Sequence, residues 1–449
     1  MDLLEFARAA RATGPLCDAC LGRPVADRSF GLTNTERGRA LRTTVALDDD
    51  KPIDAPDECW VCEGACEDFD DWADRAADAI AEYDFDTYQV GTRVPALLEE
   101  NERLLREDAG LAPDAGEPLK GEFNREVGKR LGGQIDAEVD FDRPDVQLLL
   151  DLEADSVEVQ VNSAFVYGRY RKIKRDIPQT EWPCNDCNAT GTVDGEPCEG
   201  CGGTGYRYDE SVEELTAPVV REAMDGSRAV FHGAGREDVD ARMLGTGRPF
   251  VIEVKEPRTR DVNVGDLQDD INEFADGKVE VEGLALATHD MVERVKAHDA
   301  SKTYRMTVEF AEEVNASVLE AALAELEGKT IEQRTPNRVA HRRGDIVRTR
   351  DVYAIDGKLD PDGEGMELAV GAEADDSGTS TANHATIEVH GEGGLYVKEL
   401  ISGDEGRTEP SLAGLLDIAA EVTALDVLHV EGEDEPFERE AFFRDARAE

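Results

Sequence analysis

Eight of the nine cysteines in this chain form four Cys-x-x-Cys pairs, and their spacing constrains the fold more than any other sequence feature. Two pairs lie close together in a glycine-rich segment, where tight turns can bring four thiolates around one ion. Four thiolates at this spacing are typical of tetrahedral structural zinc. We therefore predict a zinc knuckle with the ligands Cys184, Cys187, Cys198 and Cys201.

The other two pairs lie near the N-terminus and are separated by a longer loop. They predict a second zinc site, while Cys66 either replaces one ligand or stays free. Both sites are closed four-sulfur sets, so we expect them to stabilise small modules and to leave catalysis to other groups. The predicted ligands of this second site are Cys17, Cys20, Cys59 and Cys62.

The formal net charge of −52 comes from 101 acidic residues that are spread along nearly every segment. A disordered acidic tail would instead concentrate its charge in blocks without apolar periodicity. An acidic surface on a chain that still folds predicts a halophilic protein. High salt screens charge over a few ångströms, so the global charge does not exclude an RNA partner. Local arginine clusters and shape would have to provide the binding.

The first residues, Met1–Ala7, carry no basic region followed by an apolar one. No apolar run approaches the roughly 18–20 residues that span a bilayer. We therefore expect a cytoplasmic protein without a membrane partner, in which thiols stay reduced and paired cysteines indicate metal before disulfide.

The pattern of apolar residues predicts an α+β chain with a mixed, largely antiparallel sheet in its C-terminal part. An acidic segment rich in Gly, Ser and Thr, about 356–385, predicts a surface insertion with little fixed structure. The expected strands are 88–91, 157–161, 229–232, 249–254, 304–310, 386–390 and 425–430, and the expected helices are 3–10, 69–83, 97–105, 266–274, 318–326 and 412–422.

The segment Gly235–Phe250 places three carboxylates among three arginines directly before an apolar run. An arginine two residues before an aspartate, as Arg236 precedes Asp238, can keep that carboxylate ionised and aimed. Gly235 would let a bulky substrate approach the backbone. For a generic Arg-x-Asp the alternative is a salt-bridged surface loop.

Two basic clusters stand out in so acidic a chain. The first follows an aromatic run and contains Arg169, Arg171, Lys172 and Lys174. The second spans 334–350 and includes Arg338, His341, Arg342 and Arg343. We predict phosphate contacts for both clusters, and the alternative for the second is pairing with the abundant acids.

These features together resemble the archaeal and eukaryotic tRNA pseudouridine-54/55 synthases, over nearly the whole chain. Gly235-Arg236-Glu237-Asp238 matches the Gly-Arg-x-Asp signature that recurs across pseudouridine synthases. The further matching segments are Phe30-Gly-Leu-Thr-Asn-Thr-Glu-Arg37-Gly, Gly91-Thr-Arg-Val-Pro, Phe165–Lys172, Lys302-Thr-Tyr304-Arg305, Gln333–Arg343 and Leu395–Thr408.

The resemblance implies an N-terminal, zinc-containing THUMP-like RNA-binding module followed by a catalytic pseudouridine-synthase domain. We expect a zinc-binding segment over 1–66, a THUMP-like domain over 67–180, the zinc knuckle module over 181–206 and the catalytic domain over 207–449.

The resemblance also implies the roles of single residues. Asp238 would be the nucleophile, oriented by Arg236, with Asp240 as the fallback because it lies in the same loop. A flipped base is normally held by stacking, and Tyr304 is the expected stacking ring. The other substrate-binding residues implied are Tyr396, Val397, Lys398 and Leu425.

The predicted function is the isomerisation of uridine to pseudouridine in the TΨC arm of tRNA. A carboxylate can perform this reaction, so we expect no catalytic cofactor, two structural zinc ions, tRNA as the partner, and no DNA. The alternative is a non-catalytic, zinc-dependent RNA-binding or co-chaperone protein, which would leave the Asp238 loop and Tyr304 without a purpose. An RNA methyltransferase would need a glycine-rich cofactor loop after a strand, and the sequence shows none.

Overall fold

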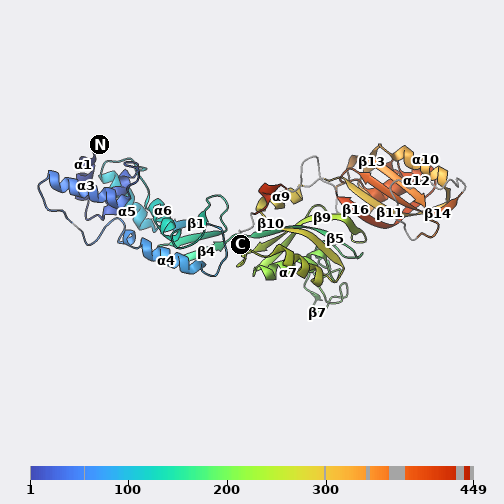
Figure 1. The fold of residues 1–449 in the computed structure, drawn as a ribbon, viewed down its shortest axis with the longest axis horizontal. Helices are drawn as coiled ribbons and strands as arrows, with labels where there is room; N and C mark the ends of the chain where they lie inside the picture. The colour runs from blue at the N-terminus through green and yellow to red at the C-terminus, as the bar shows by residue number, and fades with distance from the viewer. Residues whose placement is uncertain are drawn as a thin grey trace. The chain divides into compact units, whose positions relative to one another are not determined.

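The structure is a computed structural model that describes residues 2–54, 56–297, 300–339, 344–363, 380–430 and 439–444. The chain divides into two compact units (Figure 1). Unit one contains residues 1–163 and 255–260, and unit two contains 164–254 and 261–449. Within the described residues, no helix combines the length and the apolar character that crossing a bilayer requires.

Unit one combines an N-terminal group of helices with a small sheet. The sheet order is β2-β1-β3-β4, in which β1 pairs in parallel with both β2 and β3, and β4 is antiparallel to β3. Helices α4 and α6 cover it, because α4 places Phe69, Trp72, Ala76 and Ile80 on one buried stripe. The elements are α1 (Leu3–Ala12), α2 (Asp18–Gly22), α3 (Asn34–Asp48), α4 (Phe69–Ile80), β1 (Thr87–Arg93), α5 (Ala96–Asp108), α6 (Leu119–Leu131), β2 (Glu138–Val139), β3 (Val146–Asp151) and β4 (Ser156–Val161).

Unit two is built on one large sheet with the strand order β10-β5-β9-β16-β11-β14-β13-β12-β15, and β8 also pairs with β9. The strands are β5 (Ala164–Lys172), β8 (Arg228–Gly233), β9 (Arg242–Lys255), β10 (Val279–Ala287), β11 (Lys302–Asn315), β12 (Thr330–Arg334), β13 (Val347–Leu359), β14 (Thr381–Gly391), β15 (Thr408–Glu409) and β16 (Ala420–Val430), and a separate hairpin is formed by β6 (Thr192–Val193) and β7 (Glu196–Pro197).

The large sheet consists of two half-sheets that meet at a short seam. The first half-sheet is β8, β10, β5 and β9, and the second runs from β16 to β15. At the seam, β9 and β16 pair in parallel over only two residues each, Arg242 with Asp426 and Met243 with Val427. The pairings of β5 with β9 and β10, and those from β16 to β15, are antiparallel, which confirms the predicted mixed, largely antiparallel sheet.

Each half-sheet has its own apolar core. Helices α7 and α8 pack against β5, β9 and β10, and α9 packs against Tyr167 and Val251 on the other face. Helices α10, α11 and α12 pack against β11, β14 and β16 (Figure 1). Tyr304 contacts both cores. The helices of unit two are α7 (Val212–Ala223), α8 (Val264–Phe274), α9 (His289–Lys296), α10 (Ala316–Leu326), α11 (Val397–Ser402) and α12 (Leu412–Leu416).

Three predictions of local structure and extent need correction. The helix expected over 412–422 ends at Leu416, where Asp417 adopts a left-handed conformation, and the chain enters β16 at Ala420. The expected insertion over 356–385 begins and ends inside β13 and β14, while residues 364–379 lie outside the described residues. The RNA-binding domain expected to reach residue 180 ends sooner, because β5 pairs with β9 and β10 and so belongs to unit two.

Candidate active site

The predicted catalytic aspartate lies in a loop that connects β8 to β9 and reaches the seam between the half-sheets. We call residues 234–241 the aspartate loop. Gly235 opens it with a left-handed φ of 73°, and a Cβ atom there would lie 3.2 Å from Nη1 of Arg248. Glycine is therefore required by the backbone turn and by the arginine behind it, in addition to any approach of substrate.

Asp238 faces two cations from the second half-sheet. Arg338, in a short 3-10 turn (Asn337–Val339), places Nη1 3.4 Å from Oδ1 and 3.2 Å from Oδ2 of Asp238. Lys398, on α11, places Nζ 3.3 Å from the same Oδ2. Arg338 is itself held by Glu399, with 2.6 Å between Nε and Oε1. The Asp238 side chain is 37% exposed, so it is both paired and accessible.

Asp240 shares Lys398 with Asp238 but is more open to solvent. Its Oδ2 accepts a hydrogen bond of 2.9 Å from Nζ of Lys398, and its side chain is 60% exposed. Partial burial acts to raise the pKa of Asp240, but the hydrogen bond and charge of Lys398 outweigh burial and lower it. The stability linked to this carboxylate is therefore present above its ordinary pKa of about 3.9 and is lost as pH falls through the lowered value.

We expect Lys398→Met to raise the pKa of Asp240, because burial then acts without the opposing cation. Titration of a protein labelled with ¹³C-carboxyl aspartate, followed by NMR, measures this shift. Lys358→Met, a change on β13, is the matched control and should leave Asp240 unchanged. An unaltered Asp240 titration in the Lys398 variant would contradict the ion pair.

A buried ionic cluster around Glu237 connects the aspartate loop to β5 and β9. Glu237 accepts hydrogen bonds of 2.9 Å at both oxygens from the Tyr170 hydroxyl, and its Oε2 lies 3.1 Å from Nε of Arg248. Gln179 donates to the Tyr170 oxygen and to the Gly235 carbonyl. The side chains of Glu237 and Arg248 are each only 1% exposed, so this cluster links the loop to β5 and β9 through buried polar contacts.

Lys172, predicted to contact RNA, instead holds the loop backbone. It is fully buried, and its Nζ donates to the carbonyls of Asp238 at 3.2 Å and Val239 at 3.0 Å. Burial lowers the pKa of Lys172. Arg175 donates to the Asp240 carbonyl and to Asp426 of β16. Lys172 and Arg175, near the end of β5, therefore hold the aspartate loop in place, because their donors are occupied by its backbone carbonyls.

The remaining basic residues of the two clusters have different surroundings. Arg169 donates to the carbonyls of Thr246, Gly247 and Val430. Arg171 pairs with Glu280 and Glu282 on β10, and its phosphate contact stays a prediction. Lys174 is exposed and stays a predicted RNA contact. Arg342 and Arg343, with His341, lie outside the described residues.

Arg236 does not orient Asp238. Its side chain is exposed, and its guanidinium carbon lies 4.8 Å from the ring centre of Trp182, next to the knuckle segment. Among the described residues, the cations that contact the Asp238 carboxylate are Arg338 and Lys398.

The predicted substrate-binding residues line an apolar wall beside Asp238. Tyr304, Val397 and Leu425 belong to, or pack against, one apolar cluster. Burial, with the nearby Asp238 charge adding to it, raises the pKa of Tyr304 to about 12, so its hydroxyl stays protonated. Tyr396 is half-buried at the start of α11, where Nη1 of Arg348 donates to its hydroxyl at 3.0 Å.

The knuckle cysteine group, Cys184, Cys187, Cys198 and Cys201, forms as predicted. Its four sulfur atoms lie within 4.8 Å of one another. The Sγ atoms of Cys184 and Cys198 are 3.9 Å apart, and those of Cys187 and Cys201 are 3.8 Å apart. A tetrahedral ion with metal–sulfur bonds of about 2.3 Å requires sulfur separations of about 3.8 Å, so this donor set fits a metal ion.

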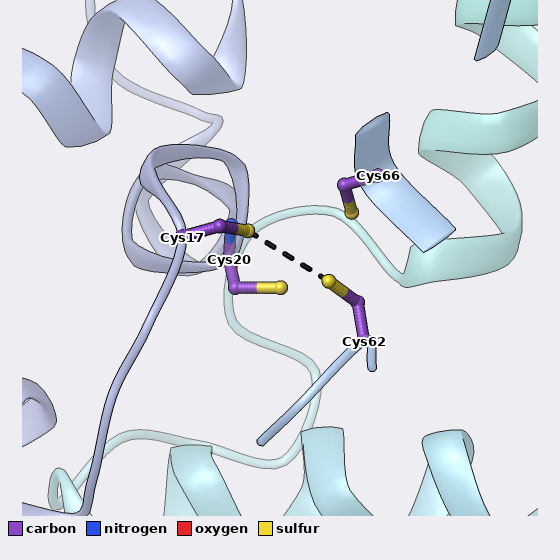
Figure 2. A group of neighbouring side chains, drawn as sticks. All are labelled: Cys17, Cys20, Cys62 and Cys66. Carbon is purple, nitrogen blue, oxygen red and sulfur yellow. Dashed lines mark hydrogen bonds between the residues drawn. The ribbon is translucent and has the colours of Figure 1, made fainter. Parts of the chain in front are cut away.

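The N-terminal cysteine group differs from the prediction in one member. Figure 2 shows the thiols of Cys17, Cys20, Cys62 and Cys66 pointing toward one another, within 4.8 Å. Cys66 thus stands where Cys59 was predicted, because the left-handed Gly64, with a φ of 94°, turns the chain back after Cys62. The alternative left open for Cys66 is the one that the structure favours. Cys59 is not a member of this group of four, but its thiol hydrogen-bonds with those of Cys17, Cys20 and Cys62.

Comparisons with known proteins decide the family. The family model described as "Pus10, C-terminal" matches residues 165–431, and "Pus10 THUMP domain, archaeal" matches residues 72–151. The chain belongs to the Pus10 family of tRNA pseudouridine synthases. This confirms the resemblance and the predicted class of enzyme, and it does not support the co-chaperone alternative.

Curated Pus10 relatives match along almost the whole chain. The "tRNA pseudouridine synthase Pus10" of Halorubrum lacusprofundi is 64% identical over 99% of this chain and 100% of its own length. Its namesake from Methanothrix thermoacetophila is 42% identical, over 96% and 95% of the two chains. That of Pyrococcus furiosus is 36% identical, over 95% and 98%. The Halorubrum relative agrees with the predicted halophilic character.

Sequence reasoning missed the residues that position the Pus10 aspartate loop. Glu237 lies inside the signature, but its contacts with Tyr170 of β5 and Arg248 of β9 arise only from the fold. Glu399 follows Lys398 directly, and a carboxylate at that place could have suggested a partner for Arg338. Tyr170 and Gln179 had no local signal, because their contacts to Glu237 and Gly235 arise only from the fold.

Proposed function

We propose that this chain isomerises uridine to pseudouridine in the TΨC arm of tRNA, with Asp238 as the nucleophile. The observation that carries the proposal is the placement of Asp238, accessible and paired with Arg338 and Lys398, on a loop braced from below. Asp240 is more exposed and pairs only with Lys398 among the described residues. Asp238 is therefore the better-oriented carboxylate.

The proposed reaction breaks the C1′–N1 bond, rotates the uracil and joins C1′ to C5. An ionised carboxylate can attack the sugar or the base, or abstract a sugar proton. Arg338 and Lys398 lie against the Asp238 carboxylate and orient it. The target base must leave the folded RNA loop, and Tyr304 offers a ring on which it can stack. Val397 and Leu425 would complete the apolar side of the pocket.

We further propose that tRNA docks through unit one, where the THUMP match lies, and through exposed cations such as Lys174. THUMP-type and other RNA-binding surfaces obtain much of their affinity from phosphate contacts. The curated relatives are named tRNA pseudouridine synthases, which favours tRNA over DNA as the partner of this chain.

The test is pseudouridine formation in an unmodified tRNA transcript. The protein, purified in high salt, should produce carbodiimide-dependent primer-extension stops at uridines of the TΨC loop. A transcript with cytidine at those positions is the control and should give no stop there. Folded, metal-loaded protein that leaves the wild-type transcript unmodified would refute the proposed function.

We propose that both cysteine groups hold structural zinc, since four thiolates match its preferred donors. Metal analysis of the intact protein should give two zinc equivalents per chain. Cys66→Ser should lower this to about one, because it removes a ligand from the N-terminal cysteine group, whereas Cys59→Ser should retain both equivalents. The reverse outcome would restore the ligand set first predicted from the sequence.

A further inference from the structure

Residues 28–33 of unit one, here called the Phe30 loop, carry the most exposed large apolar side chain among the described residues. Phe30 is 97% exposed, more than any other large apolar side chain there. Scattered exposed apolar residues are ordinary, but a fully exposed aromatic ring is a common feature of binding surfaces. The loop also belongs to a sequence motif that the catalytic site does not use.

The Phe30 loop has a defined conformation. Arg37 donates from Nε to the Arg28 carbonyl at 2.7 Å, from Nη2 to the Ser29 carbonyl at 3.2 Å and from Nη1 to Oδ1 of Asn34 at 3.0 Å. A capping box between Thr33 and Glu36 begins α3 directly after the loop. The exposure of Phe30 is therefore built into the fold.

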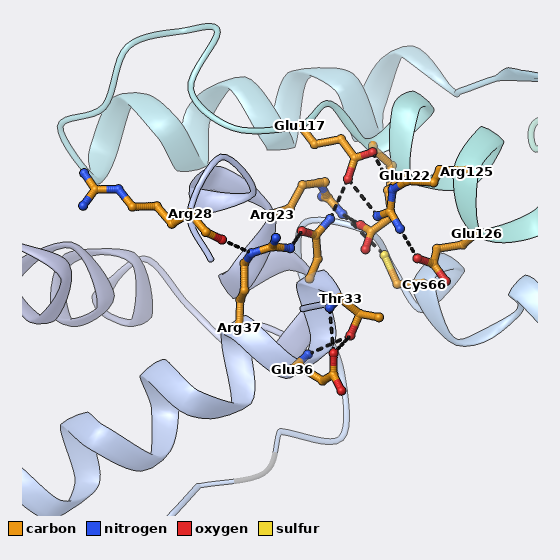
Figure 3. Close-up of polar contacts among 12 residues, drawn as sticks. Arg23, Arg28, Thr33, Glu36, Arg37, Cys66, Glu117, Glu122, Arg125 and Glu126 are labelled. Atoms are coloured by element: carbon orange, nitrogen blue, oxygen red, sulfur yellow. Dashed lines mark hydrogen bonds and ion pairs between the residues drawn. The ribbon is translucent and has the colours of Figure 1, made fainter. Parts of the chain in front are cut away.

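Beside the loop lies a cavity of about 520 Å³, whose lining carries three cations, Arg37, Arg125 and Lys129, and two carboxylates, Asp27 and Glu117. Arg125 in this lining is neutralised by Glu117, with 2.9 Å between Nη2 and Oε2. Lys129 is exposed on α6, and Arg28 extends away from the polar network (Figure 3). Within the described residues, neither these two cations nor Arg37 forms an ion pair with a carboxylate. The residues lining the cavity are Ala26, Asp27, Gly31, Leu32, Thr33, Arg37, Gly116, Glu117, Pro118, Arg125 and Lys129.

Unpaired cations are unexpected in a chain with 101 acidic and 49 basic residues, because carboxylates outnumber them by about two to one. Arg28 lies two residues from Phe30, and Lys129 lines the cavity together with Gly31 and Leu32 of the Phe30 loop. The region therefore provides both contacts that single-stranded RNA uses: stacking for a base and positive charge for its phosphates. At the molar salt of a halophilic cytoplasm the Debye length is about 3 Å, so only such short-range contacts retain their strength.

We infer that the Phe30 loop and its cavity bind an unpaired nucleotide of the tRNA substrate. The base stacks on Phe30, and the adjoining phosphates contact Arg28 and Lys129. Arg37 fixes the loop through neutral acceptors, and its charge interacts with the Glu36 carboxylate, so the phosphate contacts are assigned to Arg28 and Lys129. This inference rests on the proposed function only for the identity of the RNA as tRNA.

The test compares the Kd of an unmodified tRNA transcript, measured by fluorescence anisotropy in high salt, for the full chain and its variants. Phe30→Ala should raise the Kd about ten-fold, within the range that base–aromatic stacking contributes. Phe30→Trp should restore it, and Phe30→Leu, which keeps an apolar side chain, should not. Lys129→Ala should weaken binding several-fold. Phe274→Ala is the matched control, since Phe274 is 55% exposed and lies outside the unit through which tRNA is proposed to dock, and it should bind as wild type.

Several outcomes would overturn the inference. An unchanged Kd for Phe30→Ala, or full affinity in Phe30→Leu, would exclude stacking. A change of oligomeric state in Phe30→Ala without a change in Kd would assign the loop to a protein interface. Zinc content and the melting temperature verify that each variant is folded. If the wild-type protein forms pseudouridine while Phe30→Ala binds normally, this inference alone fails. If it forms none, the proposed function fails whatever the Kd values.

Discussion

Asp238→Asn is expected to reduce the single-turnover rate of pseudouridine formation by at least about 10³-fold, the scale seen when a catalytic nucleophile is removed. The amide has nearly the shape of the carboxylate but cannot serve as an anionic nucleophile or base. Arg338 and Lys398 would then face a neutral group, so their pairing weakens as well. Primer-extension analysis of transcripts quenched at successive times gives the rate.

The decisive control is Asp240→Asn, in the same loop and with one shared cation. It should retain activity within about ten-fold, because its contact with Lys398 is exposed and exposed ion pairs contribute only about 0–1 kcal/mol. If Asp240→Asn loses activity while Asp238→Asn retains it, the nucleophile moves by two residues. The tRNA Kd of both variants should stay near that of wild type, which separates chemistry from binding.

The second large effect concerns stability. Glu237→Gln should lower the free energy of unfolding of unit two by about 3–5 kcal/mol, because removal of one partner leaves buried cations uncompensated. Both Arg248 and Lys172 lie against this carboxylate, at 3.1 and 3.9 Å, and both are buried. Denaturant unfolding in high salt, followed through the fluorescence of Trp182 in a Trp60→Phe, Trp72→Phe background, reports on unit two alone.

Glu282→Gln is the matched control for this measurement. Its carboxylate pairs with Arg171 at 3.2 Å on the surface, where its side chain is 42% exposed. Loss of this pair should cost no more than about 1 kcal/mol. Equal effects of the two changes, or a loss below about 1 kcal/mol for Glu237→Gln, would show that the buried cluster does not stabilise the aspartate loop.

Much of the fold followed from the sequence, because period-two alternation and cysteine spacing are local signals. The strand expected at 249–254 lies in β9, and the knuckle cysteines gather as predicted. The end of the predicted helix 412–422 was wrong, because pairing of β16 with β11 overrides the local apolar pattern. Local secondary-structure propensity contains no information about a partner strand that lies about a hundred residues away in the sequence.

The sequence predicted many residues of the candidate site, but it did not predict which side chains contact one another. Charge proximity in sequence suggested that Arg236 orients Asp238, but the Arg236 guanidinium lies over the ring of Trp182. The cations that reach Asp238 come from residues 338 and 398, brought to the loop by the second half-sheet. Lys172 looked like a phosphate ligand because nothing in a sequence distinguishes a surface lysine from one that is buried against carbonyls.

β9 and β16 join the two half-sheets through only two residues each, so the site can form only after the whole chain has been synthesised. Asp238 belongs to the first half-sheet, whereas its cations are encoded far downstream: 100 residues separate Arg338 from Asp238, and 158 separate Lys398 from Asp240. Each half-sheet has its own core, so one half can be compact while the other is missing. A truncated or half-folded chain nevertheless lacks the charge-paired aspartate, and the capacity to modify RNA arises only when both halves have joined.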